Sequence, residues 1–522
     1  MEKIVSPKVL KSWLSDNQEI AFIDVREIGQ HTKGHPLFSI SIPYSSLELD
    51  IENLIPNKNT RVILIDNNDG ICILAYKKAS KLGYINIFIL EGGIQEWTKN
   101  GYELFDGINV PSKSFGELIE KHFHTPSITA QELFQKQKNN ENYVVIDGRP
   151  LEEYIKMSIP NSICCPNAEL AYRVSSYVID NKTEIIINCA GRTRSIIGAQ
   201  TLIDFGIKNN VKALENGTQG WFLSNLDLEY NKNNFLEISP NEIEFKNLQN
   251  QIFKSIKKNN IDLIDIPKAQ ELILDEKRST FIFNVTNSKM NKYLDPLIRH
   301  VPGGQLVQAT DKYIGVWRST LILVDDGDYV RAGTTAIWLK KMGFNVFILK
   351  DSLSQTSKLK FNTEVFFKSG KLNILETADL KNQLNTTFYD IRSSKDFIKQ
   401  RIKNSIWLNR SNFHKENIKE NDQILLITDN YDKAGLIAQD IKDLNLGCSI
   451  KVFKWNEHEL KNLPNFFDQE LKILSDNDCI DFNFHTYQRH EGNKSHAEQY
   501  LKWEIDLIDR MDTQELKFFR IF

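Results

Sequence analysis

The sequence has few of the features that mark membrane, secreted or nucleic-acid-binding proteins. It contains only six cysteines in 522 residues, which is too sparse for a disulfide scaffold. No apolar run approaches the length that spans a bilayer, and residues 1–16 hold no uninterrupted apolar stretch typical of a signal peptide. A net charge of -3 gives no basic excess to neutralise phosphates. We therefore expect a cytoplasmic protein with neither a membrane nor a nucleic acid as partner.

The sequence also lacks metal-ligating residues at the spacing of a metal site. No C-x-x-C pair exists, and histidines and cysteines do not cluster at the intervals of zinc ligands. In a reducing compartment each cysteine is a thiol, which is either a small core side chain or a reactive group. The residues around each cysteine distinguish these two kinds.

What the sequence does contain is a fourfold internal repeat. A chain of 522 residues exceeds one hydrophobic core and suggests roughly three to five domains. In each repeat an apolar strand ends in a polar tripeptide that begins with Asp24, Asp147, Asn284 or Asp390. A second apolar strand leads to Asp66, Cys189, Asp326 and Asp429. These residues lie 42 positions after the first residue of the tripeptide in three repeats and 39 positions after it in the fourth.

A helix and a third strand complete each repeat. Glycine, which tolerates a left-handed backbone, closes every helix, at Gly83, Gly206, Gly343 and Gly447. Strand–helix–strand alternation with nearly continuous apolar strands is typical of a parallel sheet covered by helices. The predicted fold class is α/β, with four tandem domains, each a parallel sheet flanked by helices, and a C-terminal helical tail.

The repeats also predict the domain boundaries. Four domains, the third with a preceding linker helix, are expected at residues 1–125, 126–235, 236–365 and 366–470. The first linker is expected near 105–125. Residues 471–522 form an extension with an amphipathic stretch, which is either a helix docked on a neighbouring domain or a cap over a reactive loop.

Cys189 has the richest chemical context of the six thiols. It follows an apolar strand and opens the loop Cys189-Ala190-Gly191-Arg192-Thr193-Arg194, and a helix starts near Ser195. Ligand sites of open α/β sheets lie at the carboxyl ends of strands. Loop N–H groups and a helix N-terminus favour an anion, and Arg192 and Arg194 add positive charge. We therefore expect a thiolate nucleophile at Cys189.

These motifs resemble those of the rhodanese family. The segment INCAGRTRSIIGAQ is similar to its active-site loop, with a cysteine, four residues, an arginine and a serine that opens a helix. Asp147 and Arg149 resemble its D-x-R strand end, and ENGTQGW resembles its E-G-G-x-x-x-W turn. In SIPNSICCPNAEL, which is similar to its H-I-P-G segment, Ser158 and Asn161 replace the usual histidine and glycine. The whole chain resembles bacterial proteins with four tandem rhodanese domains. The resemblance is specific in the first two repeats and faint in the last two.

The resemblance implies sulfurtransferase activity of the thiosulfate type. Cys189 would take sulfane sulfur from thiosulfate or a similar donor as a persulfide and pass it to cyanide or a thiol acceptor. Substrate would be bound by Ala190, Gly191, Arg192, Thr193, Arg194 and Ser195, with Asp147 and Arg149 in support. The resemblance implies no metal and no organic cofactor. The oligomeric state cannot be inferred from the sequence.

The other three repeats lack a cysteine at this position and are predicted to be inactive. They carry Asp66, Asp326 and Asp429, or Thr428 if the gap differs. A carboxylate cannot accept sulfane sulfur as a thiolate does, and Asp66 is expected to fill the amide cradle with its own side chain.

Two other functions remain open. Cysteine phosphatases and arsenate reductases use Cys-x5-Arg loops, but the loop from Cys189 to Arg194 is one residue shorter. Three degenerate repeats also fit a non-catalytic binding or regulatory scaffold.

Several side chains also have a purely structural interpretation. Arg192 fits a solvated charge, Arg194 a pair with Glu152 or Glu153, and Asp147 with Arg149 a buried ion pair. Cys164 and Cys165 fit a strand core, or else include a resolving thiol.

Overall fold

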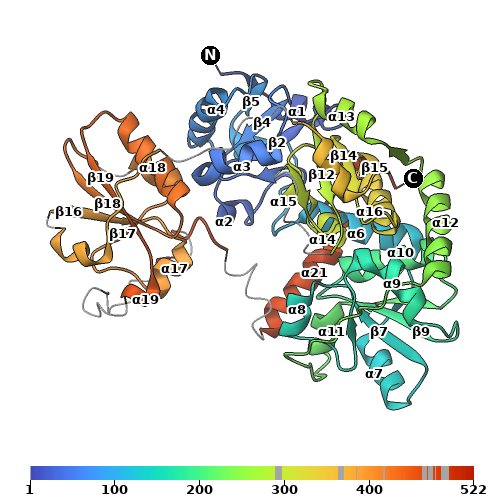
Figure 1. Ribbon diagram of the computed structural model, residues 1–522. Helices are drawn as coiled ribbons and strands as arrows, with labels where there is room; N and C mark the ends of the chain where they lie inside the picture. The colour runs from blue at the N-terminus through green and yellow to red at the C-terminus, as the bar shows by residue number, and fades with distance from the viewer. Residues whose placement is uncertain are drawn as a thin grey trace. The chain divides into compact units, whose positions relative to one another are not determined.

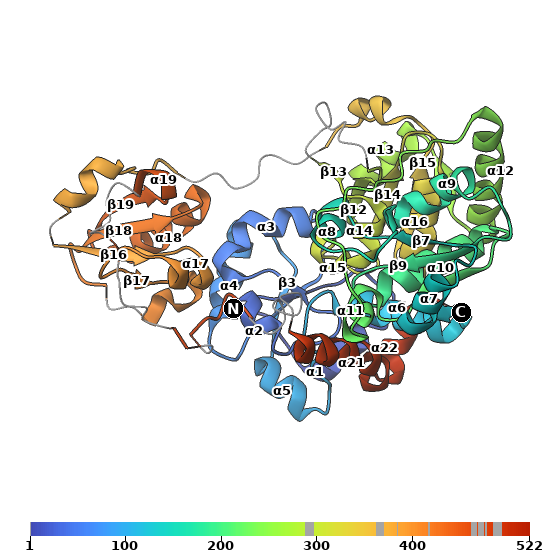
Figure 2. The same ribbon diagram turned by 90° about the horizontal axis from the view of Figure 1, so that it is seen from below.

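Four parallel β-sheets form the framework of the protein (Figures 1 and 2). The computed structural model describes residues 2–287, 297–361, 370–383, 385–415, 418–460, 467, 474–475, 478–483 and 493–521. Each sheet belongs to one α/β module, numbered 1 to 4 along the chain, and the modules group into two compact units. Unit 1 comprises Met1–Leu10, Phe22–Ile108 and Thr363–Tyr487, and unit 2 comprises Lys11–Ala21, Asn109–Asn362 and Gln488–Phe522.

Module 1 has a five-stranded sheet in the order β1-β5-β4-β2-β3. Its strands are β1 (Ile4–Val5), β2 (Ala21–Asp24), β3 (Ile40–Ser41), β4 (Val62–Ile65) and β5 (Ile87–Leu90). Its helices are α1 (Pro7–Trp13), α2 (Ile28–His31), α3 (Leu47–Leu54), α4 (Ile71–Lys81) and α5 (Gly93–Lys99). Every residue of β2 and β4 is buried, because central parallel strands are covered on both faces.

Module 2 repeats this topology with the order β6-β10-β9-β7-β8. Its strands are β6 (Ser127–Ile128), β7 (Tyr143–Asp147), β8 (Ile163–Cys164), β9 (Glu184–Asn188) and β10 (Val211–Leu214). Its helices are α7 (Ala130–Lys138), α8 (Leu151–Lys156), α9 (Asn167–Tyr177), α10 (Thr193–Phe205) and α11 (Gly217–Leu223). Ile185 and Ile187 pack in one core cluster and Ile186 in another, because alternate strand residues face opposite sides of the sheet.

Module 3 has the same order, β11-β15-β14-β12-β13. Its strands are β11 (Asp262–Ile264), β12 (Thr280–Asn284), β13 (Ile298–His300), β14 (Thr320–Val324) and β15 (Asn345–Leu349). Its helices are α12 (Glu242–Lys258), α13 (Ile266–Leu274), α14 (Gly303–Gln308), α15 (Thr310–Tyr313) and α16 (Val330–Lys341).

Module 4 has a four-stranded sheet in the order β17-β16-β18-β19. Its strands are β16 (Thr386–Asp390), β17 (Ile406–Trp407), β18 (Gln423–Thr428) and β19 (Ser449–Lys454), and its helices are α17 (Ser394–Lys399), α18 (Tyr431–Asp443) and α19 (Glu457–Leu460). A parallel bridge from Ile374 to Val452 lies where the other modules have a fifth strand. The predicted fold class, four tandem α/β domains with a helical tail, is confirmed.

The strand register corrects one predicted alignment. Asp147 pairs with Asn188, Asn284 with Val324, and Asp390 with Ile427. The residue that follows this paired position is therefore Cys189 in module 2, Asp325 in module 3 and Thr428 in module 4. The predicted Asp326 is wrong by one residue, and Thr428 rather than Asp429 occupies the position in module 4. Register depends on hydrogen-bond pairing, whereas the connections between the strands differ in length.

The linker expected near 105–125 contains a helix instead. Helix α6 (Val110–Phe123) belongs to unit 2, and its first eight residues are buried. The tail helices α21 (Lys494–Arg510) and α22 (Thr513–Phe518) also lie in unit 2, where Lys11 pairs with Asp512 and Glu515. The domain limits themselves stay a prediction. In the part of the chain that the structure describes, no helix has the length and apolar character of a membrane span.

Arg410 joins modules 1 and 4 within unit 1. Its guanidinium lies 2.6 Å from Glu48 of α3 and 2.7 Å from Asp440 of α18, and its side chain is 1% exposed. Removing one member of a buried ion pair strands the remaining charges, which costs about 3–5 kcal/mol. We predict that Arg410→Met lowers the free energy of unfolding of unit 1 by this amount in calorimetry. The exposed Lys403→Met is the matched control, and equal stability of the two variants would contradict the prediction.

Candidate active site

Cys189 lies between the end of β9 and the start of α10. The Ser195 hydroxyl donates a hydrogen bond of 3.1 Å to the Cys189 Sγ. The cysteine is only 2% exposed, but it lines a cavity of about 360 Å³. The thiol is thus shielded from bulk water while it faces a space large enough for a ligand.

The first turn of α11 holds the Cys189 loop in place. The Thr218 backbone N–H and hydroxyl donate to the Cys189 carbonyl at 2.8 and 3.0 Å. The Gln219 backbone N–H donates to the Ala190 carbonyl at 3.1 Å. Gly217 has a φ of +52°, and a Cβ there would lie 2.2 Å from the Cys189 oxygen. Only glycine fits this approach, which explains why ENGTQGW carries a glycine at that point.

Asp147 and Arg149 form a buried ion pair that ties β7 to β9. Arg149 Nη2 lies 2.8 Å from Asp147 Oδ2, and it also donates to the Met157 carbonyl at 2.7 Å. The Asn188 side chain donates to the same carboxylate at 2.7 Å. This network fixes the residue that precedes Cys189, and Arg149 also lines the cavity.

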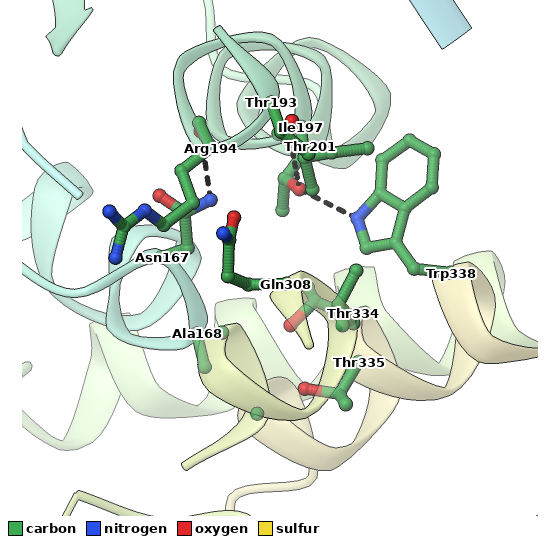
Figure 3. A pocket seen from close by; sticks show the side chains of 13 residues that line it. Asn167, Ala168, Thr193, Arg194, Ile197, Thr201, Gln308, Thr334, Thr335 and Trp338 are labelled. Atoms are coloured by element: carbon green, nitrogen blue, oxygen red, sulfur yellow. Dashed lines mark hydrogen bonds between the residues drawn. The ribbon is translucent and has the colours of Figure 1, made fainter. Parts of the chain in front are cut away.

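Arg194 is oriented by a carboxylate. This agrees with the predicted pairing of Arg194 with Glu152 or Glu153. Its two terminal nitrogens donate to Glu153 of α8 at 2.8 and 2.7 Å. The Arg194 carbonyl accepts a hydrogen bond of 2.9 Å from the Asn167 side chain (Figure 3). Arg194 is 8% exposed and lines the same cavity as Cys189.

Arg192 is directed toward α6. It forms a bidentate pair with Glu117 at 2.8 Å and a further ion pair with Glu120. Among the described residues, Arg192 is not part of the lining of the Cys189 cavity. Its position supports a role in fixing the loop, and neither direct substrate contact nor a merely solvated charge fits this geometry.

The remaining predicted site residues divide between two cavities. Ala190 and Gly191 line the large cavity beside Cys189. Thr193 lines a smaller one of about 20 Å³ between α10, α14 and α16, which Figure 3 shows. Buried oxygens of Asn167, Thr193 and Gln308 have no hydrogen-bond partner among the described residues, and a space of this size holds one water molecule.

The C-terminal helix α21 covers one side of the Cys189 loop. A Cβ on Gly191 would lie 2.9 Å from the Glu504 carboxylate and 3.4 Å from the Tyr500 ring. Glu504 accepts a hydrogen bond of 2.7 Å from the Tyr500 hydroxyl and pairs with Lys113 at 2.8 Å. Because Tyr500 also lines the cavity, α21 packs within unit 2 and covers the loop.

In modules 1 and 3 an aspartate occupies the amide cradle. Asp66 accepts hydrogen bonds from the backbone N–H groups of Asn68 and Cys72, at 2.8 and 2.9 Å. Asp325 accepts three such bonds, including one of 3.0 Å from Gly327, and burial raises its pKa to about 7. The N–H groups that could hold a ligand are therefore bonded to the chain's own carboxylates.

The other thiols near module 2 lie in the core. Cys164 and Cys165 are fully buried, and burial raises the pKa of both. A raised pKa disfavours the thiolate that a resolving cysteine requires. Within the described ranges, no group of three or more His, Cys, Asp or Glu residues is placed to hold a metal ion.

Fold and site together define a rhodanese-like module, and modules 1 and 2 each match the family model of the rhodanese-like domain. The model of the rhodanese-like domain matches residues 6–100 and 129–224. The chain is similar over its full length to the crystal structure of thiosulfate sulfurtransferase from Pseudomonas aeruginosa. That match has a TM-score of 0.88 and 28% identity, and covers 100% of this chain and 99% of the other.

A curated relative matches only a part of the chain. The Bacillus subtilis protein YrkF, which is named as a candidate sulfur carrier protein, is 29% identical over 96 residues. The match spans 18% of this chain and 50% of that protein, so it extends over about half of the relative's length.

Sequence reasoning missed much of the cavity wall. The lysines Lys113, Lys156 and Lys312, together with Gln219 and Tyr500, line the space in front of Cys189. They come from five separate segments, and only Gln219 lies in a recognisable motif. These residues come together through packing within unit 2, and no local sequence motif predicts such packing.

The burial of Glu117 makes the stability of the protein depend on pH. Burial, with help from Glu504 and Glu120, raises the pKa of Glu117 to about 7, although Arg192 acts in the opposite direction. Between pH 4.5 and about 7 the folded protein keeps a proton on Glu117 that the unfolded chain has lost. The free energy of unfolding therefore falls as the pH rises through this interval. We predict that Glu117→Gln removes about 2–3 kcal/mol of that fall. Thermal unfolding across the interval, with the exposed Glu242→Gln as control, tests this, and parallel pH profiles would contradict it.

Proposed function

We propose that the protein is a sulfurtransferase that moves sulfane sulfur from thiosulfate or a similar donor to cyanide or a thiol. A persulfide on Cys189 carries the sulfur. The observation that supports this most directly is a thiol at the carboxyl end of β9, bonded to Ser195 and facing a cavity. The similarity to the Pseudomonas aeruginosa thiosulfate sulfurtransferase points to the same chemistry.

In the first half-reaction the Cys189 thiolate attacks the outer sulfur of thiosulfate. A new S–S bond forms on Cys189, the S–S bond of thiosulfate breaks, and sulfite leaves with the electron pair. In the second half-reaction the acceptor attacks the outer sulfur of the persulfide, and the electron pair of that bond returns to the Cys189 sulfur. This is a ping-pong sequence with a covalent intermediate.

The surrounding groups are suited to anionic reactants. Arg149 and Arg194 line the cavity with Cys189, and Arg194 is proposed to hold the sulfonate of the donor. Backbone N–H groups of the loop from Ala190 to Thr193 are proposed to stabilise the persulfide. Ser195 hydrogen-bonds the attacking sulfur, and Asp147 keeps Arg149 in place. Neither half-reaction needs a metal or an organic cofactor.

The competing functions receive less support. A phosphatase loop must surround a tetrahedral phosphate, and the loop from Cys189 to Arg194 has one residue fewer than Cys-x5-Arg. A purely non-catalytic scaffold would not need a thiol that faces a cavity. Modules 1, 3 and 4 are proposed to be inactive in sulfur transfer, because Asp66, Asp325 and Thr428 stand where module 2 has Cys189. The cytoplasmic location remains a prediction.

Replacing Cys189 tests the proposal directly. We predict that Cys189→Ser lowers the rate of thiocyanate formation from thiosulfate and cyanide by more than about a thousandfold, because the nucleophile is lost. Cys164→Ser is the matched control and should keep the activity. Full activity of Cys189→Ser, or hydrolysis of a phosphate monoester by the unmodified protein, would contradict the proposal.

The hydrogen bond from Ser195 makes a smaller contribution. We predict that Ser195→Ala lowers kcat/KM for thiosulfate about 10- to 100-fold, since a hydrogen bond to a charged group contributes about 1.5–3 kcal/mol. Ser176→Ala, on α9, should match the unmodified enzyme in the same assay. Equal kcat/KM for all three proteins would exclude a role of Ser195 in sulfur uptake.

A further inference from the structure

A second cavity lies in unit 2, at the end of α10 that is remote from Cys189. Its volume of about 480 Å³ lies in the range of about 300–1,000 Å³ that is typical of sites for organic ligands. Residues of α6, α10, α12 and α16 line it together with Ile521. Helix α12 packs against α10 and α16, and α10 packs against α6 (Figure 1). Among the described residues, no side chain lines both this cavity and the one at Cys189, so the two spaces are separate.

The inner wall of this second cavity is apolar. Phe205 of α10, Ile252 of α12 and Trp338 of α16 line it, and each of them is buried. The Trp338 indole N–H donates a hydrogen bond of 2.8 Å to the Thr201 hydroxyl, as Figure 3 shows, so its one polar group is already bonded. The Trp338 ring also packs edge-on against Phe115, with the ring centroids 6.1 Å apart. A wall of this kind favours the apolar body of a ligand over ordered water.

The remaining lining residues bring positive charge to the cavity. Lys258 is the last residue of α12 and Lys341 the last residue of α16, and both line the cavity. Among the described residues, neither ammonium group has a carboxylate within ion-pair distance. Asp204, the one carboxylate of the described lining, accepts a hydrogen bond of 2.8 Å from Gln200. Two ammonium groups thus face a single carboxylate.

Holding these two ammonium groups near each other costs free energy. A basic residue in the last turn of a helix interacts favourably with the helix dipole, which explains each lysine by itself. Burial, however, lowers the pKa of Lys341, and the like charge of Lys258 lowers it further, although Asp204 acts in the opposite direction. Lys341 Nζ also lies 5.1 Å from the centroid of the Phe123 ring. An anion between the two lysines would offset both the burial and the repulsion.

We propose that this cavity binds a small amphiphilic anion, with its aromatic body against Trp338 and its carboxylate between Lys258 and Lys341. A neutral apolar molecule would leave the two lysines uncompensated, and a small inorganic anion would leave the apolar wall unfilled. An amphiphilic anion satisfies both parts of the lining. The site is distinct from the proposed sulfur-transfer site, because its residues do not line the space at Cys189.

Isothermal titration calorimetry of the full-length protein with 2-naphthoate tests the proposal, and the neutral 2-naphthamide, which has nearly the same shape, is the matched ligand. We expect one bound 2-naphthoate per chain, and 2-naphthamide should bind at least about tenfold more weakly. Lys258→Gln and Lys341→Gln should each raise the Kd of 2-naphthoate about threefold, and the double variant about tenfold. The Kd of 2-naphthamide should not change in these variants. Lys246→Gln, at an exposed position near the start of α12, should leave both values unchanged.

Ser255→Phe tests where the ligand binds. Ser255 lines the cavity from α12, and a phenyl ring at this position would take the space that the naphthyl group needs. This variant should lose 2-naphthoate binding and keep thiocyanate formation, which also shows that it is folded. No binding of 2-naphthoate, equal Kd for the two ligands, an unchanged Kd in the double lysine variant, or retained binding in Ser255→Phe would overturn the inference. The proposed function would stand in each of these cases.

Discussion

The site depends on how the Cys189 loop is held at its carbonyl oxygens. Thr218 and Gln219 bond the carbonyls of Cys189 and Ala190, and the close approach requires Gly217. With its carbonyls bonded on that side, the loop can turn its N–H groups and the thiol toward the cavity. Arg192 anchors the same loop to α6, and α21 covers Gly191. Three segments, residues 217–219, α6 and α21, therefore hold one short loop.

The same fold supports different outcomes in the four modules. The cradle of N–H groups at the strand end favours negative charge in each module. In modules 1 and 3 the carboxyl groups of Asp66 and Asp325 accept hydrogen bonds from the N–H groups of the cradle. In module 2 the corresponding position carries the Cys189 thiol, which lines an open cavity. The modules thus differ at one side chain. An aspartate occupies the cradle in modules 1 and 3, whereas the cradle of module 2 is proposed to bind the Cys189 persulfide.

The fold and the reactive loop were predictable because their signals are local. Apolar strands, glycines after helices and the repeat interval predicted the parallel sheets, and the segment from Cys189 to Ser195 carries its motif in consecutive residues. The interval failed at Asp326, because it counts residues whereas register follows hydrogen-bond pairing. The lysines of the cavity wall, helix α6 and the contact of Tyr500 with the loop arise from long-range packing. No spacing in the sequence encodes that Lys156 and Lys312 line one cavity.

Cys189, and no other thiol, is proposed to take up the sulfur. The most direct measurement is the mass of cysteine-containing peptides after the protein has reacted with thiosulfate in the absence of an acceptor. The peptide with Cys189 should gain the mass of one sulfur atom and lose it when cyanide is added. An unmodified Cys189 peptide, or a sulfur on Cys164, Cys165 or Cys72, would contradict the account.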